Sequence, residues 1–258
     1  MALASTVAVF GGIIWLVTTS PNWPEIQRRF FDPRIFADTL PVQLRAFWLN
    51  IQLFLVAEGL ILVFGLVVAV ARGLPGPVFF PVRLLATVFA ALFRALPGIL
   101  IIYLFGFGIP GLGIPGVPND RFLWAVVALT LVYSAYVSEV YRAGIESVHP
   151  SQTAAARSLG LSHLQAMRHV VVPQAVRRVI PPLLNDFIGL QKDTALVSII
   201  GVVEVFRATQ LRGQALFNYT PYLGAALIFL LLTIPLARLT DWLVARESRQ
   251  RAATGGVR

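Results

Sequence analysis

Residues 154–175 read AAARSLGLSHLQAMRHVVVPQA, a basic and strongly helix-forming stretch in a chain whose other long segments are apolar. Ser151, just before it, is expected to cap a short helix over residues 152–159. Gly160 can end that helix at the C′ position, where a left-handed backbone favours glycine. The first half of the stretch therefore predicts a short helix that stops at a sharp turn.

The second half begins with another helix-start signal. Ser162 is followed three residues later by Gln165, which is the spacing of a capping box. Pro173 is expected to break the chain before the next apolar run, because a proline inside a helix removes a backbone hydrogen bond. The whole stretch thus predicts helix, glycine turn, helix and proline.

Two uses fit this segment on composition alone. The small side chains of Ala154, Ala155 and Ala156 offer little bulk, which suits close docking into a groove on another protein. Arg157 and Arg168 would equally suit an amphipathic helix that lies on anionic lipid. Composition does not choose between a protein partner and a lipid surface.

The overall composition is that of a membrane protein. Of 258 residues, 57% are hydrophobic and 13% charged, whereas about a quarter of the residues of a soluble domain are charged. The net charge is +9, but the arginines lie at the ends of apolar runs, which argues against nucleic-acid binding. The chain contains no cysteine, so disulfides, thiolate metal sites and a cysteine nucleophile are excluded.

Several apolar runs have the length of about 20 residues that a spanning helix needs. The five clear runs are residues 46–71, 84–107, 122–141, 179–203 and 222–244. A weaker sixth candidate lies near residues 3–19, and because no basic residue precedes Arg28 it is expected to be a retained helix rather than a signal peptide.

The distribution of arginines orients these helices. Arginines gather in residues 142–178 and in the tail 246–258, which places both segments in the cytoplasm. Counting back along the helices puts residues 108–121 and 204–221 outside, and both termini inside. Residues 21–45 disagree, because they contain four arginines on the side that helix counting places outside.

Spacing within the loop favours a protein partner over lipid. Gly160 lies six residues after Ala154 and Pro173 nineteen after it, with apolar residues before the proline. This pattern resembles the cytoplasmic EAA loop of ABC-importer permeases. The resemblance continues in FRALPGILIIYLF (93–105), AYVSEVYRAGIESV (135–148), VVPQAVRRVIPPLLNDF (171–187) and KDTALVSIIGVVEV (192–205). Together these segments resemble the permeases of polar amino-acid uptake, over roughly residues 46–244.

The resemblance implies an all-α integral membrane fold, the transmembrane domain of a type I ABC importer. Five core spanning helices and an extra N-terminal helix would divide the chain into an N-terminal helix and connection (1–45), a permease domain (46–245, with its loop at about 142–178) and a basic cytoplasmic tail (246–258). In such importers two permeases, as a homodimer or heterodimer, form the pore in the lipid membrane. Two ATP-binding subunits dock on the loops, and an extracytoplasmic amino-acid-binding protein delivers the substrate.

The resemblance also assigns ATPase docking to particular loop residues, namely Ala154, Ala155, Ala156, Arg157, Gly160, Leu161 and Pro173. Two departures from the family pattern stand out. The family usually has glutamate where this chain has Ala154, so a polar contact to the ATPase is missing or supplied elsewhere, for example by the partner permease. The usual run of arginine, glycine, threonine and proline is RALP here (94–97), which changes whatever that turn touches.

Charged residues inside spanning helices are costly in lipid and usually face a bundle interior or a water path. The candidates for the translocation path are Arg94, Glu139, Asp186, Lys192 and Asp193, with Glu58 as a weaker one. Lys192, the only lysine, and its neighbour Asp193 point about 100 degrees apart on a helix and cannot pair simply with each other. Each is expected to have a partner on another helix or subunit, either as a structural lock or beside a substrate contact.

The predicted function is transport without chemistry on the substrate. No catalytic constellation or phosphate loop is present, and the glycines of residues 106–116 lack the strand and helix of a nucleotide site. We therefore expect no metal or cofactor, and ATP hydrolysis by another chain. The predicted protein is a permease of an ATP-driven importer of polar amino acids, with acidic or amide amino acids as the narrower expectation, in the bacterial inner membrane. The rival functions are a self-sufficient channel or ion-coupled carrier, and a membrane scaffold.

Overall fold

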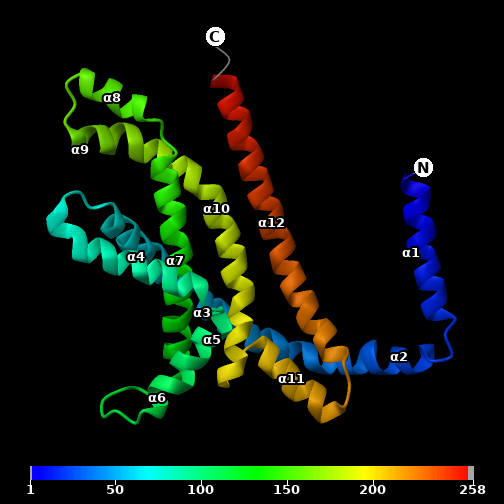
Figure 1. Cartoon of the computed structure of the whole chain (residues 1–258). Coiled ribbons are helices and arrows are strands. Elements are labelled where there is room, and N and C mark those ends of the chain that lie inside the picture. Colours follow the sequence, from blue (N-terminus) through cyan, green and yellow to red (C-terminus); the bar gives the residue numbers. More distant parts are fainter. Residues whose placement is uncertain (1, 255–258) are drawn as a thin grey trace.

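The computed structural model describes residues 2–254, and all regular structure in that range is helical (Figure 1). The long helices are α1 (Ala2–Thr18), α3 (Pro33–Gly73), α4 (Phe80–Ala95), α7 (Arg121–Glu146), α10 (Val172–Asp193) and α12 (Thr220–Thr254). The shorter α-helices are α2 (Trp23–Phe30), α5 (Gly98–Tyr103), α6 (Ile109–Gly111), α8 (Pro150–Ser158), α9 (His163–Ala166) and α11 (Val205–Leu216). The remaining turns are 3-10 at Pro77–Phe79 and Thr194–Ile200, and π at Leu104–Gly108 and Met167–Val171.

The structure contains the five predicted core spans if one bent pair of helices is counted as a single span. Within the described residues, four helices are long and apolar enough to cross a membrane, and a fifth span results if the bent pair His163–Ile200 and Val205–Leu216 is one unit. The core forms where α3, α7 and α10 meet, around the fully buried side chains of Leu53, Ile61 and Leu190. Packing at this crossing holds the bundle together, because spanning helices associate through close side-chain contact.

The prediction of one continuous helix over residues 84–107 was wrong. Helix α4 ends at Ala95, and α5 begins at Gly98 after an extended Leu96 and Pro97. The residue before a proline is pushed out of the helical region, and proline itself has no backbone donor. The RALP segment is therefore a break inside the span.

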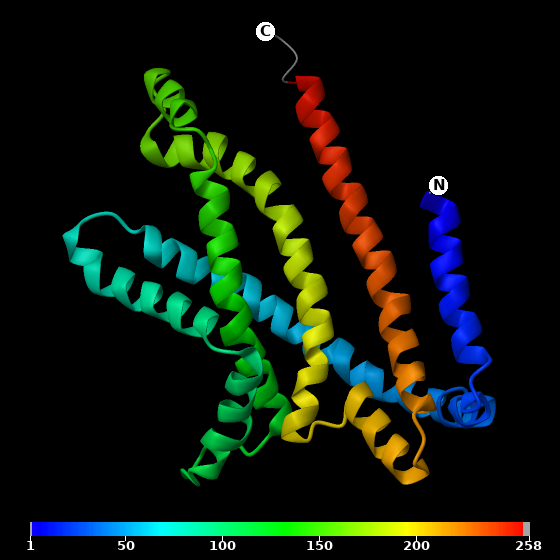
Figure 2. The same ribbon diagram turned by 45° about the vertical axis from the view of Figure 1, so that its right-hand side comes forward.

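The two ends of the bundle group the connections as predicted. Helices α8 and α9 lie at the same end as the last turns of α12, whereas α6 and α11 lie at the opposite end (Figures 1 and 2). We call these the inner and outer ends. The predicted basic tail, residues 246–258, continues α12 as far as Thr254, and residues 255–258 lie outside the described range.

The N-terminal segment joins the outer end through α2. Tyr219 N donates to Arg29 O at 2.7 Å, and Asn218 Nδ2 donates to Arg28 O at 2.8 Å, so α2 is held against the connection between α11 and α12. Residues 21–32 therefore lie at the outer end, as helix counting predicts and contrary to the prediction from their arginines. Helix α1, the predicted sixth helix, is separated from the other long helices, and α12 is the nearest of them in both views (Figures 1 and 2). Its side chains from residue 5 to residue 18 are exposed.

Candidate functional site

Helix α8 opens the loop at the inner end, and its cap differs from the predicted one. The N-cap is His149, whose Nδ1 accepts a hydrogen bond from Ser151 N at 3.2 Å. Pro150 then occupies the first turn, where its missing donor costs nothing. Ser151 was predicted as the cap and instead lies inside the helix, because the proline before it already provides a helical start.

The glycine turn after α8 is confirmed. Gly160 has φ +87°, Gly160 N donates to Arg157 O at 3.0 Å, and Leu161 N donates to Ala156 O at 3.2 Å. This pair of hydrogen bonds is a Schellman motif, which satisfies the last carbonyl groups of a helix. A side chain at residue 160 would be strained by the positive φ, although a Cβ there would meet open space.

The second helix also begins as predicted, but Pro173 does not stop it. Ser162 and Gln165 form a reciprocal capping box, with hydrogen bonds of 3.2 and 2.8 Å. The chain then stays helical from His163 through the π turn Met167–Val171 into α10. Pro173 lies in the first turn of α10, so the wider turn before it removes the need for its backbone donor. The predicted break is instead a bend.

The outward surface of the loop combines exposed apolar side chains with the exposed Arg157 and Arg168. Leu159 is 85% exposed and Leu164 78%, beside the exposed Ala154 and Ala155. Ala156 is buried, because three consecutive helical residues cannot share one face. Apolar side chains this exposed on a loop at one end of the bundle indicate a contact surface for another protein.

The loop is fixed firmly to the spanning helices below it. Val148, Val171 and Ala175 form a small buried cluster at its base, and Arg178 Nη1 donates to the carbonyl oxygen of Ser147. The last turn of α7 and the first turn of α10 are therefore joined through the loop. A push on the loop would reach both spans, because packed helical segments move as units.

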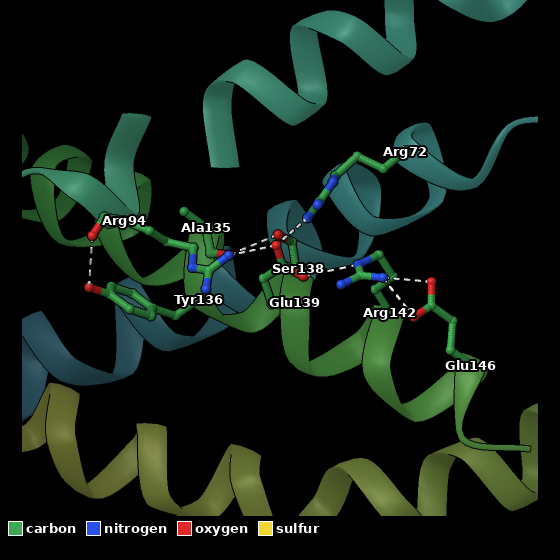
Figure 3. Close-up of polar contacts among 8 residues, drawn as sticks. All are labelled: Arg72, Arg94, Ala135, Tyr136, Ser138, Glu139, Arg142 and Glu146. Carbon is green, nitrogen blue, oxygen red and sulfur yellow. Dashed lines mark hydrogen bonds and ion pairs between the residues drawn. The ribbon is translucent and has the colours of Figure 1, made fainter. Parts of the chain in front are cut away.

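A cluster of charges ties three helices together in the inner half of the bundle (Figure 3). Glu139 of α7 forms ion pairs with Arg72 of α3 at 2.9 Å, with Arg94 of α4 at 2.6 Å and with Arg142 of α7 at 2.9 Å. Arg142 also binds Glu146 at 2.6 Å. The Glu139 side chain is only 20% exposed, so its carboxylate serves mainly these three guanidinium groups. Glu139 is thus the centre of the cluster.

The other predicted path residues lie on α3 and α10, with Lys192 and Asp193 at the outer end of α10. Asp193 accepts a hydrogen bond from Tyr133 of α7 at 2.8 Å, so its expected partner on another helix is present. Asp186 and Glu58 are half-buried, and Asp186 Oδ2 has no hydrogen-bond partner among the residues that the structure describes. Lys192 is exposed and forms no ion pair within residues 2–254.

Sequence reasoning missed a buried polar network at the outer end. Asn50 of α3 donates to Thr194 Oγ1 and to Glu204 Oε2, both at 3.0 Å, and accepts from Val205 N at 3.1 Å. Gln43 donates to Thr209 Oγ1 at 2.9 Å. A polar amide inside or beside a predicted span was the available signal, because hydropathy averages hide such residues.

Comparison with known proteins agrees with this geometry. A model of the family "Binding-protein-dependent transport system inner membrane component" matches residues 61–249. A probable glutamine ABC transporter permease protein of Bacillus subtilis is 35% identical over 82% of this chain and 96% of its own length. An arginine transport system permease protein of the same organism is 33% identical over 76% of this chain and 87% of its own length. The crystal structure of an amino acid ABC transporter with histidines matches with a TM-score of 0.76 and 30% identity, over 83% of this chain and 98% of that one.

Proposed function

Because the chain belongs to the family of binding-protein-dependent transport system inner membrane components, we propose that it is the permease subunit of an ATP-driven importer of polar amino acids. The chain is a multi-pass inner-membrane protein with the transmembrane fold of a type I importer. The names of two relatives, which specify glutamine and arginine, support amino acids as the substrate class. The glutamine relative agrees with the expectation of an amide amino acid.

The observation that carries this proposal is the loop at the inner end. It projects beyond the bundle, ends its first helix in a Schellman motif and exposes Leu159 and Leu164. An ATP-binding subunit with an apolar groove would bury these side chains, and α7 and α10 would transmit its movement. Hydrolysis of ATP is then assigned to that partner and not to this chain.

The translocation path is proposed to run past the charged residues of the bundle. Arg94 is 42% exposed on its side chain and Lys192 is exposed, so both can reach a water-filled path between two permeases. Asp186 and Asp193 lie on α10, the helix that also contains Lys192, and are proposed to border the same path. Glu139 contributes as the counter-charge that holds Arg94 in place.

The remaining partners follow from the same assembly. A second permease, either an identical copy or a related chain, would complete the pore. An extracytoplasmic amino-acid-binding protein would deliver substrate to the outer end, near α6 and α11 (Figure 2).

Reconstitution tests the proposal against a self-sufficient channel or carrier. The chain would be placed in vesicles with or without its ATP-binding subunit, and uptake of labelled glutamine and arginine would be measured with the binding protein present. We expect uptake only when the ATP-binding subunit and ATP are both supplied, and none with a non-hydrolysable ATP analogue. Uptake by the chain alone would instead identify a channel or an ion-coupled carrier.

A further inference from the structure

A cavity of about 700 Å³ opens at the outer end of the bundle. Five segments line it: α5, the π turn after α5, the start of α7, the 3-10 turn Thr194–Ile200 with Gly201, and α11. Its apolar lining includes Ile99, Phe107, Leu196, Ile199 and Phe206. A mostly apolar hollow of this size with a few polar groups is the usual form of a small-molecule site.

Two arginines bring positive charge into this cavity without a matching acid. Arg121 Nη1 donates to Gly201 O at 3.4 Å, and Arg207 Nη1 donates to Gln210 Oε1 at 3.3 Å. Both contacts are long, and neither arginine forms an ion pair within the described range. Guanidinium groups bind carboxylates with two parallel hydrogen bonds, so both arginines retain unused capacity.

The two nearest acids in sequence are already engaged. Asp120 caps α7 by accepting from Phe122 N at 2.8 Å. Glu204 is fully buried and accepts from Asn50 Nδ2 and from the backbone N–H groups of Phe206 and Arg207. Neither carboxylate forms an ion pair with Arg121 or Arg207 within the described residues.

The position of Arg121 depends on a glycine. Gly201 has φ +82°, and a Cβ on it would lie 2.7 Å from Arg121 Nη1. Any other residue would be strained by the backbone and would push the guanidinium away. The missing side chain at Gly201 therefore leaves room for the Arg121 guanidinium group to lie against the wall of the cavity.

We infer that this outer cavity binds the α-carboxylate of a free amino acid as it enters the membrane domain. The inference rests on the proposed function, since it names where the substrate is first held. Arg121 and Arg207 bind the carboxylate. The backbone oxygen of Gly201 and the side-chain amide oxygen of Gln210, released from their long contacts, accept from the α-ammonium group. The apolar walls receive the side chain, which leaves selectivity among amino acids to other parts of the transporter.

The same arginines could instead receive an acidic side chain of the binding protein. The cavity is a hollow lined mainly by apolar side chains from several helices, which favours the small ligand. If the arginines bind a free amino acid, their replacement weakens amino-acid binding. If they bind an acidic side chain of the binding protein, their replacement weakens docking of that protein.

Equilibrium binding to the assembled transporter in nanodiscs tests the inference. The probes are labelled glutamine and arginine, with the α-carboxamide analogue of each, and the variants are wild type, the double change Arg121→Gln with Arg207→Gln, and Arg207→Lys. Arg212→Gln is the matched control, because Arg212 is an exposed arginine on α11 outside the cavity lining. Affinity of the binding protein for each variant and basal ATP hydrolysis are measured in parallel.

We expect the double variant to bind the amino acid about tenfold or more weakly, since a charge-assisted hydrogen bond contributes that much. The α-carboxamide analogue should bind the wild-type transporter about as weakly as the amino acid binds the double variant. Its affinity should not fall further in the double variant. Arg207→Lys should recover part of the affinity, while Arg212→Gln, basal hydrolysis and binding-protein affinity stay unchanged.

Three results would overturn the inference. The first is wild-type transporter that binds neither amino acid, and the second is a double variant that still prefers the carboxylate. The third is an unchanged amino-acid affinity with a lost binding-protein affinity, which would assign the arginines to docking. ATP-dependent uptake by the wild-type transporter is scored separately, so failure of this site leaves the proposed function standing.

Discussion

The inner and outer ends of the bundle are built in opposite ways. At the inner end a loop projects outward, is shaped by hydrogen bonds between near neighbours in sequence, and exposes Leu159 and Leu164. At the outer end the chain is hollowed, and buried side chains such as Asn50 and Glu204 join helices far apart in sequence. The difference indicates that substitutions in the buried network at the outer end act on stability, whereas those on the loop at the inner end act on coupling to a partner.

The largest expected effect is the loss of stability when the buried hydrogen bonds of Asn50 at the outer end are removed. Asn50→Leu removes a donor from the buried Glu204 carboxylate and leaves Val205 N unpaired, so the free energy of unfolding should fall by roughly 2–4 kcal/mol. Thermal unfolding of the purified protein in detergent measures this. Asn185→Leu is the control, because Asn185 is exposed on α10. Equal melting temperatures for the two variants would show that the network does not lock the outer end.

The next effect concerns the charge cluster between the ends. Glu139→Gln leaves three guanidinium groups without their shared counter-charge, so uptake should fall about tenfold or more and stability by roughly 2 kcal/mol. Glu146→Gln is the matched control, because Glu146 is 60% exposed and binds Arg142 alone. Uptake and melting temperature are compared for both. If the two variants behave alike, Glu139 is not the centre of the cluster.

Residues of the proposed path should affect transport more than folding. Arg94→Ala and Lys192→Ala should each lower uptake by roughly tenfold, with assembly on the ATP-binding subunit retained, because partly exposed arginine and lysine side chains contribute little to stability. Co-purification reports assembly, and vesicle uptake reports transport. Normal uptake in both variants would remove them from the path, and loss of assembly in both would make them structural.

The smallest effect is expected from the loop's positive charges. Changing Arg157 and Arg168 together to Gln should alter stability by less than about 0.5 kcal/mol, since both side chains are exposed, and should lower coupling only about twofold, because Arg157 is one contact of a larger docking surface. Vesicle flotation and coupled ATP hydrolysis are the measurements. A strong loss of both would support the alternative that the loop lies on anionic lipid.

The two ends also differ in how much of them the sequence predicts. Gly160 and the Ser162–Gln165 pair act on residues next to them, so the glycine turn and the capping box of the loop could be predicted from spacing. The three arginines around Glu139 come from helices α3, α4 and α7, and no local pattern states that they meet.

Prolines in the sequence account for two further differences between the prediction and the structure. Pro97 lies inside the apolar run 84–107, and its backbone chemistry breaks the helix that hydropathy alone extends. Pro173 misled in the other direction, because a π turn before it provides a helical route past the proline. Asn50 is uncharged and was hidden by the apolar residues around it.

The central claim is that the loop at the inner end transmits force from an ATP-binding subunit to the spans, and Gly160 tests it most directly. Gly160→Asp adds about 1 kcal/mol of backbone strain and a charge on the docking surface, whereas Gly160→Asn tolerates the left-handed conformation and adds no charge. The measurement is ATP hydrolysis stimulated by the loaded binding protein, together with uptake, in reconstituted vesicles. We predict that Gly160→Asp inserts and folds but loses both stimulation and uptake, and that Gly160→Asn keeps most of each. Normal stimulated hydrolysis and uptake in Gly160→Asp would contradict the account.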